Sequence, residues 1–148
     1  MPDVPDVPAG SAASAGEGLS DAFWAVTRQL RHLSRETLGP LEITPGQSRA
    51  LRVLARQGPI RLSELADHLR IAPRSTTEVV DGLQDRGLVE RRPDPHDRRA
   101  TLVAVTEAGE RTGALIRSAR VAETERLFGA LSETDRAHLA RILDQLRQ

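Results

Sequence analysis

The chain contains no cysteine and, among its 21 basic residues, no lysine. The missing thiols exclude disulfide bonds, cysteine-ligated zinc and thiol-based redox sensing. Every basic residue is therefore arginine, whose planar guanidinium suits bidentate contacts; a GC-rich coding sequence explains this bias equally well. Because 21 acidic residues balance the arginines, total charge predicts no polyanionic partner, and any site for one must come from local clustering.

Long apolar runs are also missing from the sequence. No stretch approaches the roughly 20 apolar residues of a membrane-spanning helix, and the first residues lack the apolar region of a secretion signal. We therefore expect a soluble, cytoplasmic protein with no membrane partner.

Sequence patterns typical of catalysis and metal binding do not occur. The histidines are scattered, with no HExxH and no carboxylate at metal-ligand spacing. There is no GxSxG nucleophile elbow, and Gly16-Glu17-Gly18 follows no strand, so it does not fit a phosphate-binding loop. We predict that the protein is not an enzyme and has no cofactor and no metal.

The order of patterns along the chain predicts four segments. Residues 1–18 are rich in Pro, Ala, Gly and Ser and are interpreted as a disordered N-terminal tail. Residues 19–43 predict a long helix, residues 44–105 a compact unit, and residues 106–148 two further helices, which Thr106 and Ser132 are expected to cap. The apolar stripes of the end helices exceed what a core of roughly 60 residues covers. We therefore expect them to act as dimerisation helices in a two-fold homodimer.

The compact unit begins with a strong helix start and continues with a helix-turn-helix. Thr44-Pro45-Gly46-Gln47 offers a Thr cap, Pro at the first helical position and Gln to close a capping box. Two short helices follow closely, one capped by Ser63 and one that starts near Pro73 and ends at Gly87.

A β-hairpin follows the second short helix directly. Residues 88–92 and 100–105 predict two strands joined by the loop PDPHD. The predicted fold class is therefore mainly α with a small β-hairpin wing (α+β), a winged helix-turn-helix flanked by N- and C-terminal dimerisation helices.

The first turns of the second short helix carry the candidate base-reading residues Arg74, Ser75, Thr76 and Thr77. In a helix-turn-helix these positions face base edges and phosphates in the major groove. Arginine binds guanine bidentately, and Ser and Thr suit phosphates or several bases. A solvated polar surface is the alternative for such a helix face, but the hairpin that follows favours double-stranded DNA as the partner.

The predicted hairpin loop lies between two pairs of arginines. Its prolines restrict the backbone, and Asp97 lies close enough in sequence to Arg99 to hold its guanidinium in place. An arginine at a hairpin tip fits a narrow, A·T-rich minor groove, where the negative potential is enhanced. Phosphate contacts, or solvent-exposed charges beside the strands, are predicted for Arg91, Arg92 and Arg98.

The stretch LSELADHLRIAPRSTTEVVDGLQDRGLVERRPDPHDRRATLVAVTEAG resembles the MarR family of bacterial transcription regulators, and the layout matches over residues 19–148. The resemblance implies a homodimeric regulator that binds a pseudo-palindromic operator, often as a repressor, and releases it on binding a small aromatic or anionic ligand. It also implies that Arg99, in the motif Asp97-x-Arg99, enters the minor groove and that Ser75 and Thr77 contact DNA.

Two residues depart from the family pattern, and three suggest a ligand site. Glu78 stands where many members carry a basic residue, and Gly82 in mid-helix costs about 1 kcal/mol relative to alanine; the sequence explains neither. Trp24, Arg28 and His32 lie at i, i+4 and i+8 on the first long helix and are candidates to line the implied ligand pocket, with Arg28 pairing an anion. A packing tryptophan beside two surface charges is the alternative.

A different function also fits a winged helix, namely binding of an acidic protein partner through the arginines. A protein-binding helix face is expected to expose apolar anchors. The face around Arg74 shows none in the sequence, so DNA is the favoured partner.

Overall fold

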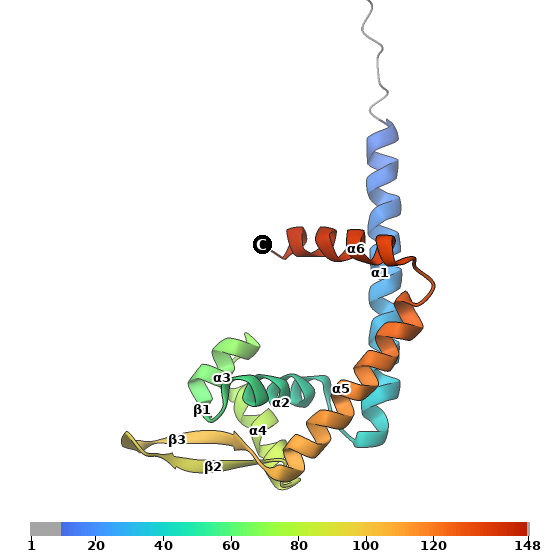
Figure 1. Ribbon diagram of the computed structural model, residues 1–148. Coiled ribbons are helices and arrows are strands. Elements are labelled where there is room, and N and C mark those ends of the chain that lie inside the picture. Colours follow the sequence, from blue (N-terminus) through green and yellow to red (C-terminus); the bar gives the residue numbers. More distant parts are fainter. Residues whose placement is uncertain (1–9, 148) are drawn as a thin grey trace, which may run out of the picture.

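The computed structural model describes the backbone of residues 10–147 and the side chains of residues 15–147. Helices α1 and α5 pack side by side, and the remaining elements other than α6 gather at the end opposite the N-terminal half of α1 (Figure 1). No helix in this described part is long and apolar enough to cross a membrane. The elements are, in order, α1 (Gly10–Leu38), η1 (Gly39–Leu41), α2 (Pro45–Gln57), β1 (Ile60–Arg61), α3 (Leu62–Leu69), α4 (Pro73–Asp85), β2 (Val89–Asp94), β3 (Asp97–Val105), α5 (Glu107–Phe128) and α6 (Glu133–Leu146).

Helix α1 begins earlier than its apolar stripe suggests. It starts at Gly10, so the prediction of a disordered tail is wrong for residues 10–18, while residues 1–9 lie outside the described part. Ala12, Ala13 and Ala15 lie in this extension, and alanine has the highest helix propensity. A segment with too few apolar residues to form a core can therefore still extend a helix that the following residues have nucleated.

The predicted starts of α2, α5 and α6 are confirmed. Thr44 Oγ1 accepts a hydrogen bond from the Gln47 amide at 3.1 Å, and Gln47 Oε1 accepts one from the Thr44 amide at 3.0 Å, which completes the capping box. Thr106 and Ser132 cap the other two helices through their hydroxyls. These local hydrogen bonds satisfy amides that the helices themselves leave unpaired.

The predicted cap of α3 is wrong. Ser63 lies within the helix, and the cap position is Arg61, whose amide donates to Glu64 Oε2 at 2.8 Å. Arg61 also belongs to the two-residue strand β1, which the sequence analysis did not predict. One residue therefore ends a strand and starts the first helix of the helix-turn-helix.

The β-sheet has three strands in the order β1-β3-β2, all antiparallel. The strands of the hairpin are longer than predicted, so the loop between them comprises only Pro95 and His96. Pro93 lies within β2, opposite Thr101. A proline is tolerated there because β2 is an edge strand, on which one side needs no hydrogen-bond donor.

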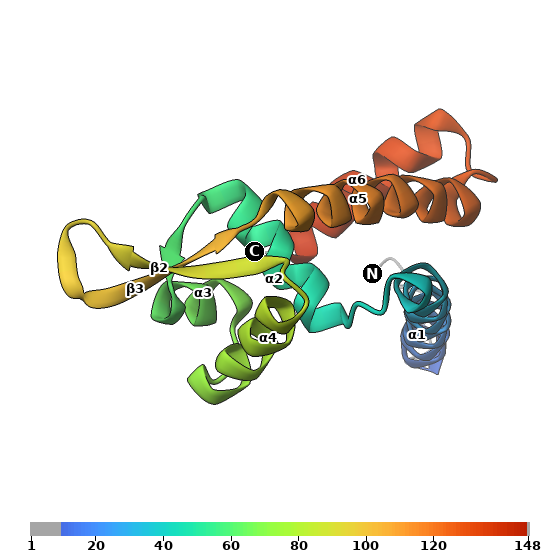
Figure 2. The same cartoon turned by 90° about the horizontal axis from the view of Figure 1, so that it is seen from below.

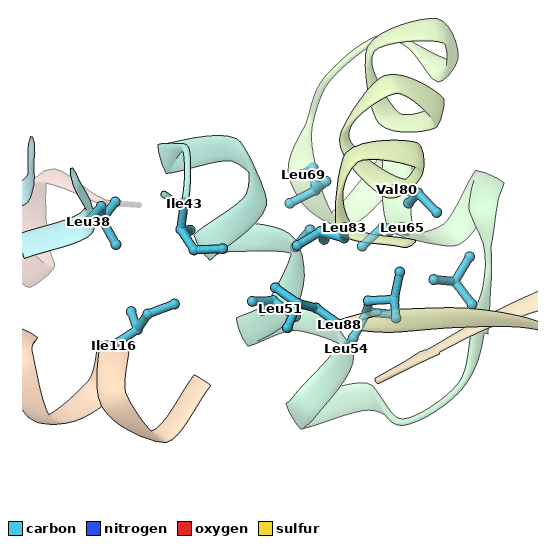
Figure 3. Packing of buried hydrophobic residues seen from close by; sticks show 13 residues of the cluster. Leu38, Ile43, Leu51, Leu54, Leu65, Leu69, Val80, Leu83, Leu88 and Ile116 are labelled. Carbon is cyan, nitrogen blue, oxygen red and sulfur yellow. The ribbon is translucent and has the colours of Figure 1, made fainter. Parts of the chain in front are cut away.

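The core lies inside the winged unit, between α2, α3, α4 and the sheet (Figure 3). Leu38 from α1 and Ile116 from α5 extend this core to the two long helices, so the wing, the helix-turn-helix and the bases of those helices share one apolar cluster. The predicted winged helix-turn-helix with flanking helices is confirmed. Its most completely buried large side chains are Leu54, Leu65, Leu69, Leu83, Val80, Val89, Val103 and Thr76.

Candidate nucleic-acid interface

Helix α4 and the β2–β3 wing lie at the same end of the molecule, with the wing projecting away from α1 (Figures 1 and 2). The end of α4 is fixed by Gly87, which has a φ of +69°. Its amide donates to the Gln84 carbonyl, and the amide of Leu88 donates to the Leu83 carbonyl, the pattern of a Schellman motif. This turn leads the chain directly from α4 into the first wing strand.

Two of the four predicted base-reading residues, Arg74 and Ser75, are exposed on the first turn of α4. The prediction for Thr76 is wrong, because its side chain is fully buried and its hydroxyl donates to the Ala72 carbonyl at 3.2 Å. Thr77 is half-buried, and its hydroxyl donates to the Pro73 carbonyl at 3.0 Å. The surface that α4 offers to a partner is therefore narrower than its sequence suggests.

The burial of Thr76 follows from its position on the helix. It precedes Val80 and Leu83 by four and seven residues, the spacing of one helical face, and all three are buried in the core. This periodic signal was present in the sequence. It was outweighed by the polar character of the threonine side chain.

Glu78 lies one turn after Arg74 on the exposed face of α4. The Arg74 Nε atom and Glu78 Oε1 are 3.4 Å apart, and the side chains are 91% and 69% exposed. An ion pair with this exposure is weak and opens readily in water. Both groups are therefore available to a ligand that approaches the N-terminal half of α4.

The arginines at the base of the wing are engaged with the protein's own side chains. Arg91 donates to Asp81 Oδ1 of α4 at 2.7 Å and also to Gln84. Arg92 pairs with Glu90 on the same strand. Arg91 therefore connects the wing to α4, and its predicted phosphate contact would require this connection to open.

At the tip of the wing, Arg98 and Arg99 are exposed. The Asp97 Oδ1 atom accepts a hydrogen bond from the Arg99 backbone amide at 3.0 Å. This corrects the prediction that Asp97 holds the Arg99 guanidinium: the carboxylate orders the backbone of the turn. Within residues 15–147, neither Arg98 nor Arg99 forms an ion pair.

A buried carboxylate fixes the other side of the turn. Asp94 Oδ2 accepts from Nε and a terminal nitrogen of Arg61 at 3.1 and 2.8 Å, and Asp94 Oδ1 accepts from the His96 amide at 2.9 Å. The His96 amide and then the Arg61 guanidinium hold the pKa of Asp94 below its ordinary value. The same guanidinium lies 3.5 Å from Asp97 Oδ2. Arg61 thus anchors the wing to the start of α3.

Sequence reasoning missed Arg61 because nothing local identifies it. It is separated from Asp94 by 33 residues, and the strand that brings it to the wing is only two residues long. The antiparallel pairing of β1 with β3, Arg61 opposite Leu102, is what places the guanidinium beside the hairpin.

The three predicted ligand residues lie on α1, and none of them lines the cavity between α2 and α5 that is described below. Trp24 is 53% exposed and packs edge-on against Phe23, with ring centroids 5.9 Å apart. His32 Nε2 lies 3.4 Å from Glu36 Oε1, and Arg28 is exposed. The predicted ligand role of Trp24, Arg28 and His32 stays a prediction.

A cavity of about 230 Å³ lies between α2 and α5. Most of its lining surface is apolar, and the polar side chains in it are arginines and Ser48. Burial together with the nearby Arg120, Arg49 and Arg56 lowers the pKa of Arg52. The Ser48 hydroxyl is buried and has no hydrogen-bond partner among the described residues. The lining includes Ser48, Leu51, Arg52, Arg56, Arg117 and Arg120.

Comparison with known proteins gives a consistent result. The model of the MarR family matches residues 43–101. An uncharacterized HTH-type transcriptional regulator, Mb0904 of Mycobacterium bovis, is 36% identical over 127 residues, which cover 86% of this chain and 84% of that protein. A MarR family protein from Bacillus stearothermophilus has a similar structure, with a TM-score of 0.80 and 26% identity over 92% of this chain and 95% of that one. A mutant MarR from E. coli in complex with operator DNA has a TM-score of 0.75 and 27% identity, covering 87% of this chain and 93% of that one.

Proposed function

The chain belongs to the MarR family of transcription regulators, and from this we propose that it binds operator DNA as a homodimer and acts as a repressor that a small anionic ligand releases. The observation that carries the proposal is the pairing of an exposed first turn of α4 with a wing tip that presents Arg98 and Arg99. In winged helix-turn-helix proteins these two elements reach the DNA together.

The exposed first turn of α4 supports a major-groove contact. Arg74 and Ser75 offer a bidentate donor and a hydroxyl where a recognition helix meets base edges. The wing supports a minor-groove contact, because Arg99 lies in β3 directly after a turn whose backbone is ordered by Asp97 and Asp94. A pre-ordered turn loses less conformational entropy on binding than a mobile one.

The homodimer is supported by apolar side chains that the single chain leaves exposed. Such residues lie on α1, α5 and α6. Helix α6 in particular buries none of its described residues. Helix-turn-helix dimers bind half-sites about 34 Å apart, one turn of DNA, and we expect the same separation between the two copies of α4. The exposed large apolar residues are Leu19, Phe23, Trp24, Val26, Leu30, Leu115, Val121, Leu131, Ile142, Leu143 and Leu146.

The cavity between α2 and α5 supports an anionic effector. Its guanidinium groups repel one another, as the lowered pKa of Arg52 indicates after the larger effect of burial, and an anion would relieve this repulsion. Ser48 supplies an unused hydroxyl at the same place. Because α2 belongs to the winged unit and α5 to the long helices, a ligand here would act on their relative position.

Selection from a randomised duplex library with the full chain, followed by fluorescence anisotropy at fixed salt, tests the function. We expect one enriched, two-fold related sequence. Arg99→Ala should weaken binding to it by ~1–3 kcal/mol, most where the flanks are A·T-rich. Arg147→Ala, at the exposed end of α6, is the matched control and should leave affinity unchanged. A chain that enriches no sequence and binds no duplex would refute DNA binding and favour an acidic protein partner.

A further inference from the structure

Helix α4 carries an unusual charge for a helix that approaches DNA. Among its 13 residues Arg74 is the only basic one, against Glu78, Asp81 and Asp85. Phosphate neutralisation, which gives most DNA-binding proteins their general affinity, therefore cannot come from this helix. Each acid must either be neutralised within the protein or face a hydrogen-bond donor, because an unpaired charge is costly to remove from water.

Two of the three acids are accounted for by their positions. Asp81 accepts a hydrogen bond from Arg91 of the wing at 2.7 Å. Asp85 is the last residue of α4, about 10 Å along the helix axis from Glu78 and at the end that leads away from the groove in helix-turn-helix proteins. Glu78 alone lies in the N-terminal half, where it is exposed and, among the described residues, forms only a weak ion pair with Arg74.

On the basis of the proposed function, we propose that Glu78 is a specificity-determining residue that accepts a hydrogen bond from the N4 amino group of a cytosine in the operator. Glu78 follows Arg74 by four residues, about 6 Å along the helix axis. The two side chains therefore reach base pairs that are either adjacent or separated by one further base pair. Arg74 then reads guanine through its O6 and N7 acceptors.

The chemistry of the major groove selects cytosine for this position. Cytosine presents there only the N4 donor, whereas guanine presents two acceptors and thymine an acceptor and a methyl group. Adenine has a donor, but its N7 acceptor lies beside it and repels a carboxylate. Contact with a phosphate is disfavoured by like charge.

The test compares libraries selected by the full-length wild type, by Glu78→Gln and by Asp85→Asn. Glutamine pairs bidentately with adenine, so Glu78→Gln should change one cytosine per half-site to adenine, with a shift in the C-to-A preference of roughly tenfold or more. Asp85→Asn removes the same charge from the other end of α4 and should leave that base unchanged. Since both side chains are exposed, circular dichroism should show all three proteins equally folded.

A reciprocal measurement completes the test. An operator in which that C·G pair is replaced by A·T should bind Glu78→Gln better than wild type, which a merely structural role of Glu78 would not produce. The inference is overturned if Glu78→Gln retains the same cytosine, or if it tightens binding to all sequences alike. Failure of the proposed function looks different, because the wild type would then select no sequence.

Discussion

Replacing Gly82 with alanine measures how closely α4 packs against the start of α2. A Cβ atom at Gly82 would lie 2.7 Å from Nε2 of Gln47, so the Gln47 side chain must move. That side chain also accepts the hydrogen bond from the Thr44 amide that closes the capping box of α2. The close approach explains why glycine stands in the middle of α4, which its helix propensity does not.

Two effects of similar size oppose each other in Gly82→Ala. Alanine stabilises a helix interior by about 1 kcal/mol relative to glycine. Displacing Gln47 removes a hydrogen bond with a net value of about 0.5–1.5 kcal/mol. We therefore expect Gly82→Ala to change the free energy of unfolding by less than about 0.5 kcal/mol. In a Gln47→Ala background the obstacle is gone, and the same substitution should stabilise the protein by about 1 kcal/mol.

The coupling energy is obtained from urea denaturation of four proteins: the wild type, Gly82→Ala, Gln47→Ala and the double variant. All four are measured at one fixed protomer concentration, because dimerisation affects apparent stability. The expected value is about 1 kcal/mol between Gly82 and Gln47. Two results contradict the reasoning. If Gly82→Ala stabilises by its full propensity in the wild type, Gln47 is not an obstacle. If it destabilises equally in both backgrounds, the backbone and not Gln47 limits the approach.

Three further outcomes are expected. Gly109→Ala should destabilise by ~3 kcal/mol or more in thermal unfolding, because its Cβ would lie 1.9 Å from the Leu88 carbonyl oxygen; a smaller loss would mean that α5 shifts freely. Arg98→Ala should reduce the salt dependence of DNA binding by about one unit for all sequences, and an unchanged slope removes Arg98 from the phosphate contacts. Since Asp94 has a lowered pKa, its stabilisation is complete above its ordinary value of 3.8 and is lost as pH falls through its folded-state pKa. The stability difference between wild type and Asp94→Asn should therefore shrink on acidification, and a difference independent of pH refutes this.

The parts of the fold that depend on local chemistry were predictable from the sequence. The caps at Thr44, Thr106 and Ser132 and the glycine at position 87 are confirmed, because each of these signals involves residues at most a few positions apart. The hairpin was predicted too short, since Pro93 argues against a strand unless the strand lies at a sheet edge. That edge position depends on the order β1-β3-β2, which no local pattern specifies.

The candidate site was predictable only in part, for a related reason. Exposure of Arg74 and Arg99 follows from their places at a helix start and beside a turn, whereas the burial of Thr76 depends on what packs against α4. The anchoring of the wing by Arg61 depends on a contact across 33 residues. Sequence patterns thus indicate which residues are chemically suited to DNA, and tertiary packing decides which of them are free to reach it.

The net charge of the protein is informative only when arginines bound within the fold are separated from arginines that can reach DNA. Arg61 and Arg91 are bound to acids of the chain, and Arg86 donates to two backbone carbonyls of the segment after α1. These arginines fix the wing, α4 and the long helix relative to one another, while Arg98 and Arg99 extend beyond them. A net charge of zero lowers the affinity for DNA of any sequence, because this general affinity depends on the release of counterions from the phosphates. It does not lower discrimination, which depends on base contacts. A net charge of zero is therefore compatible with a regulator whose binding relies on a few exposed side chains.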